Sequence, residues 1–502
     1  MNGKDYHHLT SYDRRRMTGH ALDWDHRPDL YKRYPNARSI PLPAKGVTAG
    51  ARSLWDILLD SRASPAAPRK MTLAGLAALL GLSYGITAAV RYPQETFSYR
   101  SAPSAGALYP CEIYIAAYAV DGLDPGLYYF SVVDFALKQI RGADIAGFLG
   151  QNSGKGLALS LYVTGIPYRS AWKYRARAYR YVLLDSGHLL GNLALVLKAQ
   201  KLISEITYDL DDAATGLLLG VDNCREAGVA RLDAGCPDDW QKDAFVGPGE
   251  IPALTGEMLA ASRVSDRETG YPEIEQMLVA GLPGQCLTEV VRPPPPVVLA
   301  APGKWQPAGR ANWPTDSDPL TRTMVSRRSS RNFVPLEIQG DSFKNLLALL
   351  SAAITGSLSM GPPVERHLSI GFVAGAIEGV APGFYLLDPQ ARQYALVSPG
   401  QLSTPMAAVC LNQDWLKNAG VHFLFMLNPG YLDETCGPRG YRYAMIQAGF
   451  LGQVVYLGAT ALGLGACGIG AIYDDEAEVL LDLGNGSGLG YLVAVGIVKK
   501  TK

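Results

Sequence analysis

The sequence is poor in charge, and the charges it has are balanced. Its 46 Lys and Arg match 46 Asp and Glu, so the formal net charge is zero, which excludes a strongly basic nucleic-acid-binding protein. Charged residues make up 18% of the chain, against about 25% in a typical globular protein. With so few charges, the 502-residue chain is expected to bury much of its surface, either in a large core or in a contact between domain-like units.

Clustered cysteines are also lacking. The chain has seven cysteines, and no two of them form a Cys-x-x-Cys pair. An odd number of unclustered cysteines predicts reduced, buried thiols and no metal site, as in a cytoplasmic protein. The first residues, MNGKDYHHLTSYDRRR, lack the apolar stretch of about 7–15 residues that a signal peptide needs. We therefore expect a cytoplasmic location.

No pattern predicts a membrane span or a dinucleotide domain. Residues 444–473 carry no charge, but they include seven glycines and two glutamines. A buried helix and a glycine-rich turn fit them better than a span of about 20 apolar residues. Gly463, Gly465 and Gly468 have the spacing of a dinucleotide fingerprint. They follow a predicted helix, whereas that fingerprint needs a preceding strand, so no separate NAD(P) domain is predicted.

The sequence does contain an internal repeat. GLDPGLYYF (122–130) is similar to GVAPGFYLL (379–387), and a long apolar helix predicted over 179–200 is similar to another over 440–463. Equivalent residues lie 257, 262 and 265 residues apart in three places: Pro125 and Pro382, Tyr179 and Tyr441, Arg62 and Arg327. This slowly changing offset predicts a duplicated domain with small insertions, because a solenoid would repeat every ~20–50 residues.

The repeat divides the chain. We predict an N-terminal arm (1–50), a first domain (51–236), a Pro-rich linker region (237–315) and a second domain (316–502). The linker region includes RPPPP at 292–296, which favours an extended, semi-rigid spacer. Inside the domains the patterns predict helices over 71–81, with Thr72 as N-cap, and over 343–354, and a strand over 111–120.

Four motifs carry a resemblance to a known family. SAPSAGALYP (101–110), followed by a strand, resembles the flavin-contacting loop of nitroreductase-superfamily proteins, and more narrowly that of the SagB/McbC-type FMN-dependent azoline oxidases, which form thiazoles and oxazoles. RRSSR (327–331) resembles the superfamily's phosphate clamp, and GLGACGIGA (463–471) its late glycine-rich flavin turn. Trp172-Lys173-Tyr174 is similar to the Lys-Tyr pair of the azoline oxidases.

The resemblance implies an α+β fold with two nitroreductase-like domains in tandem. Proteins of this superfamily are dimers that bind FMN at the subunit interface, and one subunit supplies the clamp and the late turn while its partner supplies the loop. A tandem chain can imitate that dimer within one molecule. We therefore expect a monomer that acts as a pseudo-dimer, or a dimer of such monomers.

The two halves keep complementary motifs. The loop has no match at its equivalent, residues 360–367, and the clamp's equivalent, residues 62–66, keeps only one arginine and the serine. The late turn's equivalent, residues 200–208, has no glycine, and Lys173-Tyr174 aligns with Thr435-Cys436. The first half thus supplies the loop and the Lys-Tyr pair, and the second half the clamp and the turn. This predicts one complete composite FMN site and one decayed site.

Each motif suits its predicted role. Arginine forks bind phosphate oxygens in pairs, a serine hydroxyl adds a donor, and small residues let the backbone approach a flat ring. Gln413 resembles a family glutamine that faces the pyrimidine edge of flavin. The predicted cofactor-binding residues are Pro103, Ser104, Ala105, Gly106, Leu108, Arg327, Arg328, Ser329, Arg331, Gln413, Gly468, Gly470 and Ala471.

The predicted reaction is the conversion of an azoline ring to an azole, which removes a ring proton and a hydride. Flavin can accept the hydride, and the protein has to supply a base. Lys173 and Tyr174 are the predicted catalytic residues. The expected substrate is a peptide or a carrier-bound azoline, without a nucleic-acid or membrane partner.

Three alternatives stay open. The chain could be an NAD(P)H-dependent nitro- or ene-reductase, or a non-catalytic partner protein that binds flavin or peptide. The segment around Lys173, YRSAWKYRARAYR, could also be a basic, aromatic helix edge that binds an acidic group.

Overall fold

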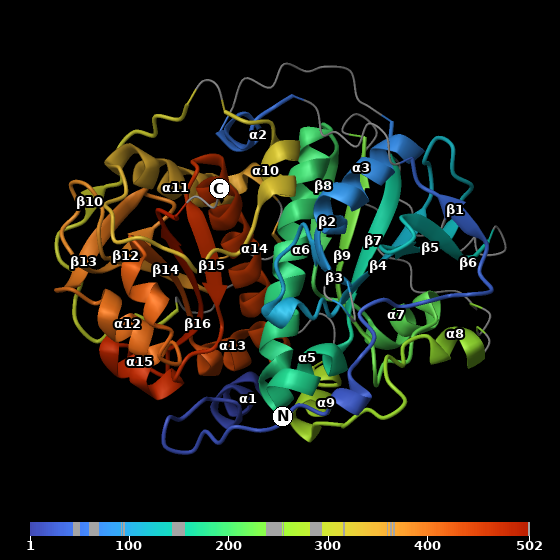
Figure 1. The fold of residues 1–502 in the computed structure, drawn as a ribbon, viewed down its shortest axis with the longest axis horizontal. Coiled ribbons are helices and arrows are strands. Elements are labelled where there is room, and N and C mark those ends of the chain that lie inside the picture. The colour runs from blue at the N-terminus through green and yellow to red at the C-terminus, as the bar shows by residue number, and fades with distance from the viewer. Residues whose placement is uncertain are drawn as a thin grey trace.

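The structure is a computed structural model that describes residues 1–43, 51–59, 70–91, 93, 96–142, 156–236, 251, 254, 256–281, 294–314, 317–358, 360–361, 364 and 367–499. Within these ranges the chain forms two α+β domains that lie side by side, each built on a seven-stranded antiparallel sheet (Figure 1). In Figure 1 the N-terminal domain is blue to green and the C-terminal domain yellow to red. The predicted tandem α+β fold is confirmed.

The N-terminal sheet has the strand order β1-β6-β5-β4-β7-β9-β8. Its central strand β4 is buried along its whole length, as its apolar composition predicts, and it occupies most of the strand predicted over 111–120. The bounds are β1 (Ser39–Pro41), β4 (Cys111–Ala117), β5 (Gly126–Ser131), β6 (Ala136–Arg141), β7 (Leu157–Gly165), β8 (Ile203–Thr207) and β9 (Ala227–Gly235), with a separate hairpin of β2 (Ile86–Arg91) and β3 (Thr96–Arg100).

The C-terminal sheet repeats this order position by position as β10-β13-β12-β11-β14-β16-β15. The two echoing Pro-Gly segments lead into β5 and β12, and both strands occupy the same place in their sheets. The bounds are β10 (Gln306–Pro307), β11 (Ser369–Ala374), β12 (Gly383–Asp388), β13 (Gln393–Pro399), β14 (Val421–Leu427), β15 (Gly465–Ile469) and β16 (Gly488–Gly496).

The predicted helices are present within a few residues. In α3 (Leu73–Tyr84), the Thr72 hydroxyl accepts a hydrogen bond from the Gly75 N–H at 3.0 Å, which is the expected N-cap. The two long apolar helices are α6 (Ala178–Ala199) and α14 (Arg439–Ala461), and the remaining described α-helices are α1 (Gly3–Leu9), α2 (Leu54–Leu59), α5 (Pro167–Tyr174), α7 (Asp212–Leu219), α8 (Gly256–Ala260), α9 (Pro272–Leu278), α10 (Leu320–Ser326), α11 (Gly340–Ala352), α12 (Ser403–Val409), α13 (Pro429–Cys436) and α15 (Asp474–Leu480).

Helices α6 and α14 form the centre of the molecule and pack against each other between the two sheets (Figure 1). Glycines allow the close approach, because a Cβ on Gly187 would lie 2.8 Å from the Gly449 Cα, and a Cβ on Gly449 would lie 2.9 Å from the Leu184 Cα. Two helical stretches, Pro167–Ala199 with α6 and Arg439–Ala461, are long and apolar enough to cross a membrane, but 94% and 89% of their most apolar windows are buried inside the protein. Their apolar surface is used in the contact between the domains.

Short segments of each half pack on the other half. Helix α1 lies against α13, where the Gly3 N–H donates to Asp433 Oδ1 at 2.7 Å, and α2 packs against α11. In the opposite direction α10 packs against α3. These exchanges, together with the α6–α14 contact, make the tandem domains an intramolecular pseudo-dimer.

The predicted arm and linker region both contribute to the folded domains. Strand β1, from residues 1–50, pairs with β6, and β10, from residues 237–315, pairs with β13. Lys32 forms a buried ion pair with Glu226, and the Ser262 hydroxyl donates to the same carboxylate at 2.8 Å. Of RPPPP, the first two residues lie outside the described residues.

The expectation that all cysteines are reduced is wrong. Five of the described cysteines are free thiols, but Cys436 is disulfide-bonded, and Cys286 lies outside the described residues. A disulfide requires two Cα atoms about 4.4–6.8 Å apart, and cysteines distant in the sequence give no local signal of such proximity.

Candidate cofactor site between the domains

The loop 101–110 of the N-terminal domain is held by the clamp of the C-terminal domain. Arg327 Nε donates to the Ser101 carbonyl oxygen at 2.7 Å, and its Nη2 donates to the Arg100 carbonyl oxygen at 3.2 Å. Within the loop, Gly106 has a φ of 66°, and a Cβ there would lie 2.8 Å from the Tyr174 hydroxyl. The loop therefore needs glycine both for its backbone and for the approach of Tyr174.

Arg327 retains an unused donor. The residue is only 4% exposed, and its Nη1 is buried without a hydrogen-bond partner in the part of the chain that the structure describes. No carboxylate among the described residues pairs with it, and burial lowers its pKa because the charged form loses hydration. An unbalanced buried guanidinium of this kind fits an anion such as a phosphate.

The other clamp residues lie beside Arg327 with their polar groups near the surface. Arg328 and Arg331 are exposed, and Arg328 Nη2 donates to the Thr87 carbonyl oxygen at 3.1 Å. The Ser329 hydroxyl is 3.0 Å from the Tyr456 hydroxyl. The charge of Arg331 opposes part of the rise that burial causes in the pKa of Tyr174, so the clamp reaches the Lys-Tyr pair.

The predicted glycine-rich turn is instead mostly a strand, β15, followed by Gly470 and Ala471. Its Gly468 N–H donates to the Tyr456 hydroxyl at 2.6 Å, and a Cβ on Gly470 would lie 2.7 Å from the Tyr181 ring. Gly468 and Gly470 therefore serve close packing against tyrosines, whereas Gly463, with a φ of 71°, changes the chain direction between α14 and β15. The Ser330 N–H donates to the Ala466 carbonyl oxygen at 2.8 Å, which joins the clamp to this strand.

The turn after β15 is anchored by the N-terminal domain. Arg177 Nη2 donates to the Gly470 carbonyl oxygen at 2.9 Å, and its Nη1 donates to Asp474 Oδ2 at 2.7 Å. Burial alone would raise the pKa of Asp474, but Arg177 and Arg180 outweigh burial and hold that pKa well below its usual range. The carboxylate is thus charged at neutral pH and fixes the turn.

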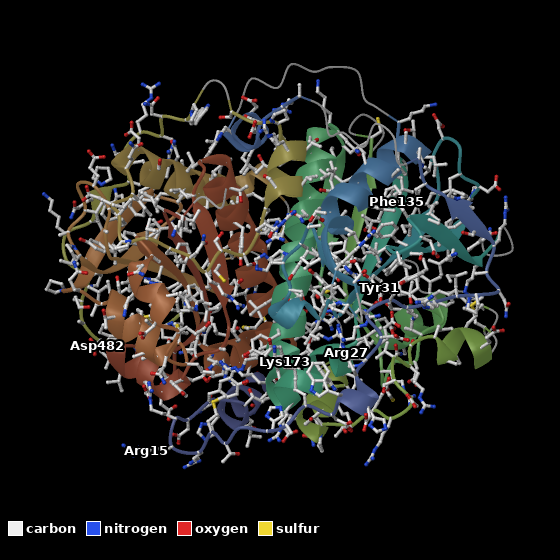
Figure 2. All side chains as sticks on the ribbon, viewed as in Figure 1. Arg15, Arg27, Tyr31, Phe135, Lys173 and Asp482 are labelled. Atoms are coloured by element: carbon white, nitrogen blue, oxygen red, sulfur yellow. The ribbon has the colours of Figure 1, made fainter. Side chains whose placement is uncertain are left out.

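Lys173 and Tyr174 end α5 at the boundary between the domains, where Figure 2 shows Lys173. Both side chains are half-buried. Lys173 Nζ lies 5.4 Å from the centre of the Tyr174 ring, which is 4.6 Å from the centre of the Tyr181 ring. Burial, with a further contribution from Asp185, raises the pKa of Tyr174, so this phenol keeps its proton at neutral pH.

Sequence reasoning missed two buried residues at this place. Tyr181 is buried with its ring against that of Tyr174, and the Asp185 carboxylate accepts from the Ser104 hydroxyl at 2.5 Å. Asp185 is the only acid in a helix of 22 residues. A lone carboxylate in a buried apolar helix is costly, and this was the signal that could have identified it.

The structure brings most of the predicted residues together, but not Gln413. Contacts connect the loop to Arg327 and Tyr174, the clamp to β15, and Gly470 to Tyr181. Gln413 donates its side-chain amide to the Cys410 carbonyl oxygen at 2.9 Å and, among the described residues, makes no hydrogen bond to another predicted site residue.

These residues fit a flavin mononucleotide. Among the described residues, Arg327 Nη1 is a buried donor without a hydrogen-bond partner, and the small residues of the loop let its backbone approach a flat ring. The clamp could hold the phosphate, and the loop with the turn after β15 could hold the ring system. In the described part of the chain, no group of three or more His, Cys, Asp or Glu could hold a metal ion.

The equivalent place in the other half is filled. Tyr208 follows β8 as Gly470 follows β15, and its ring packs 5.8 Å from the Tyr443 ring. A Cβ on Gly361 would lie 2.9 Å from the Tyr208 ring. His367 Nδ1 lies 2.9 Å from Gln447 Oε1. Residues 62–66, the clamp's equivalent, lie outside the described residues.

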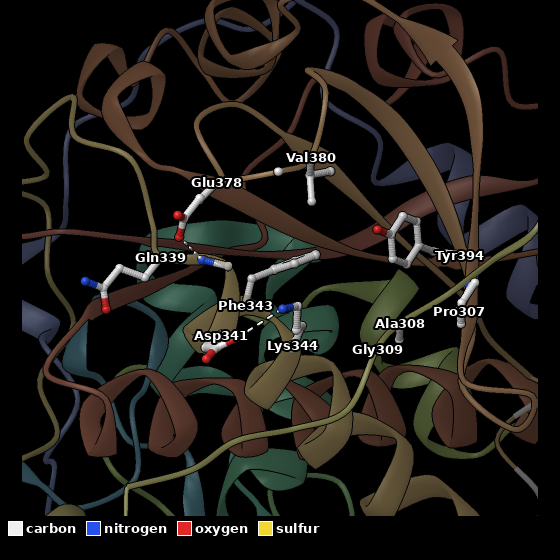
Figure 3. Close-up of a pocket in the computed structure, with 12 residues that line it drawn as sticks. Pro307, Ala308, Gly309, Gln339, Asp341, Phe343, Lys344, Glu378, Val380 and Tyr394 are labelled. Carbon is white, nitrogen blue, oxygen red and sulfur yellow. Dashed lines mark hydrogen bonds and ion pairs between the residues drawn. The ribbon is translucent and has the colours of Figure 1, made fainter.

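A cavity lies elsewhere, in the C-terminal domain between β10, β13 and α11 (Figure 3). Its volume is about 580 Å³, and its lining includes Phe343, Tyr394 and Lys344. None of the predicted cofactor or catalytic residues lines it.

The comparisons agree with this architecture. Residues 324–497 match the model of the nitroreductase family. A protein of Methanocaldococcus jannaschii described as a nitroreductase is 30% identical over 121 residues, which are 24% of this chain and 59% of that protein, so the match spans about three-fifths of this relative. A crystal structure from Anabaena variabilis, also described as a nitroreductase, superposes with a TM-score of 0.76 at 25% identity over 99% of both chains.

One domain also has a more distant likeness. The Escherichia coli microcin synthetase McbBCD complex with truncated pro-MccB17 bound includes a chain that matches with a TM-score of 0.30 at 20% identity, over 46% of this chain and 90% of that chain. The family match places residues 324–497 in the nitroreductase family, and the full-length superposition shows that the two domains together have the fold of a tandem nitroreductase-like protein. The two domains of this chain are the two nitroreductase-like units that the sequence predicted.

Proposed function

We propose that the chain is an FMN-dependent oxidoreductase with one complete site between its domains. The observation that carries this proposal is the meeting of motifs from both halves: Arg327 of the second half bonds the loop carbonyl oxygens of the first half. Neither half has a complete set of these motifs. The composite site therefore exists only in the paired arrangement.

The clamp residues Arg327, Arg328, Ser329 and Arg331 would hold the phosphate of FMN. The buried Arg327 Nη1, which has no partner among the described residues, supports this assignment, since a dianionic phosphate balances a charge that no described carboxylate balances. The loop from Pro103 to Leu108 and the backbone of Gly468, Gly470 and Ala471 would contact the ring system.

The proposed reaction is the dehydrogenation of an azoline ring, carried by a peptide or a carrier, to an azole. FMN supplies the acceptor for the hydride when it is bound. Lys173 would take the proton from the azoline ring at its amino group, and Tyr174 would orient the azoline ring beside Lys173. Lys173 is half-buried, so a substrate can reach its amino group, which lies next to the Tyr174 ring.

The test uses the purified full-length chain with a short thiazoline peptide, supplied with air as electron acceptor. We expect a yellow protein that releases FMN on denaturation and a product two mass units lighter than the substrate. The matched control is the same peptide with a thiazole in place of thiazoline, which cannot lose two further hydrogens. A colourless protein that does not bind added FMN would contradict the proposal.

An NAD(P)H-dependent nitro- or ene-reductase is the alternative, and the relative described as a nitroreductase supports it. The two activities differ in their electron donor, which is NADPH for the reductase and the azoline substrate for the dehydrogenase. Steady oxidation of NADPH with a nitroaromatic acceptor, without conversion of the thiazoline peptide, would favour the reductase.

A further inference from the structure

Asp185 of α6 ties the loop of the candidate site to the interface helix. Its side chain is buried, and its carboxylate accepts a hydrogen bond from the Ser104 hydroxyl at 2.5 Å and from the Ala105 N–H at 3.2 Å. The Ser104 oxygen in turn accepts from the Tyr109 N–H at 2.9 Å. Three consecutive bonds thus fix both ends of the turn between Ser104 and Tyr109.

No basic side chain among the described residues forms an ion pair with Asp185. The titratable groups that respond to its charge are Tyr109 on the loop, Cys111 on β4, Tyr174 on α5 and Tyr491 on β16. Burial is the main reason that the pKa of each is raised, to about 12 for Cys111, so all four are neutral near pH 7. Burial also raises the pKa of Asp185 to about 7, against the lowering effect of the bonds from Ser104 and Ala105.

The pseudo-symmetric position differs in one respect. Gln447 lies 262 residues after Asp185, at the offset of the two long helices. Its Nε2 donates to the Met360 carbonyl oxygen at 3.3 Å, and its Oε1 is 2.9 Å from His367 Nδ1. Both residues thus bind the loop of their own half, Asp185 through a carboxylate and Gln447 through a neutral amide.

We propose that the ionised Asp185 is the positioning residue that holds the Ser104–Tyr109 loop in the conformation that binds FMN, and that protonation of this carboxyl releases the loop. The inference rests on the proposed FMN site. An ionised carboxylate accepts both loop donors, whereas a protonated one carries a hydrogen on one oxygen and loses acceptor capacity there. Protonation therefore weakens the loop contacts, and FMN affinity falls as the pH drops below about 7.

The experiment measures FMN affinity of the full-length chain by quenching of flavin fluorescence from pH 5.5 to 8.5. We expect binding about tenfold weaker at about pH 6 than at about pH 8, since the ionised fraction changes by about that factor. The phosphate of FMN also titrates near pH 6, so riboflavin, which has no phosphate, is measured in parallel. The same loss of affinity with riboflavin assigns the change to the protein.

Three variants sharpen the test. Asp185→Asn should bind FMN more weakly at pH 8 and lose the pH dependence seen with riboflavin. Ser104→Ala removes a bond that lowers the pKa of Asp185, so the midpoint should rise by about one pH unit. Gln447→Glu, the matched control in the other half, should keep the wild-type profile. Thermal unfolding at each pH separates these effects from loss of the fold.

The outcomes distinguish this inference from the proposed function. The role of Asp185 would be overturned if the wild type and Asp185→Asn bound FMN with the same pH profile, or if the midpoint did not rise in Ser104→Ala. Either result would leave the proposed cofactor unaffected. Absence of FMN binding by the wild type at every pH would overturn the proposed cofactor and, with it, this inference.

Discussion

Lys173 belongs to the domain that lacks the phosphate clamp, so its contribution can be separated from cofactor binding. Replacing Lys173 by Ala should leave FMN bound, because no clamp contact is lost. Removal of the proposed base should reduce azoline turnover about 10²–10⁴-fold. The measurement is the rate of thiazole formation together with the flavin content of each variant.

Thr435→Ala is the control for that substitution. Thr435 is the aligned residue in the other half, and its hydroxyl donates to the Tyr431 carbonyl oxygen within its own helix. Its loss should not change the rate. Wild-type turnover by Lys173→Ala with flavin intact would show that Lys173 is not the base.

Arg327 has two roles that a substitution removes together, since it bonds the loop and retains a free donor. Arg327→Ala should weaken FMN binding by about 1.5–3 kcal/mol, the usual contribution of a hydrogen bond to a charged group, as measured by equilibrium titration. Arg322→Ala is the matched control, because Arg322 is an exposed residue one turn earlier that pairs only with Asp318 in the described chain. Arg62→Ala, at the decayed clamp, should also leave flavin content unchanged, and an equal loss there would reverse the assignment of the halves.

At the scale of elements, the contact between α6 and α14 depends on backbone approach. Gly449→Ala would place a Cβ 2.9 Å from the Leu184 Cα, and neither helix can shift without disturbing both domains. We expect a loss of about 1–3 kcal/mol in the free energy of unfolding, as for other overpacked cores, measured by denaturant titration. Gly430→Ala in α13 is the control, since its nearest neighbours would be at an ordinary 3.6 Å. Equal stability of the two variants would show that the helices can move apart.

The helices and strands differ in how well the local sequence predicts them. Apolar runs with ordinary helix formers predicted α3, α6, α11 and α14, because their pattern reflects only their own burial. Strand β15 was predicted as a turn because the segment is rich in glycine. Its Gly468 contacts Tyr456 and Tyr491, and both tyrosines come from other elements of the chain. The exchange of α1 and α10 between the halves, and the bond from Asp185 to the loop, likewise depend on contacts across the sequence that no local pattern contains.

For the whole molecule, the two interface places predict an unequal stoichiometry. Tyr208 and His367 fill the place equivalent to the candidate site, and Tyr208 is buried there. We expect one FMN per chain, measured as released flavin against protein quantified by amino-acid analysis. A ratio near two would show that the second place also accepts the cofactor.

Because the two domains are covalently connected, a single substitution changes only one of the two interface sites. When two identical subunits build two interface sites, every change in the gene enters both sites at once, so neither can be altered alone. In this chain Asp185 and Gln447 occupy matching positions on paired helices but are encoded separately. One side of the interface can therefore change without the other, and protein engineering can address each side independently.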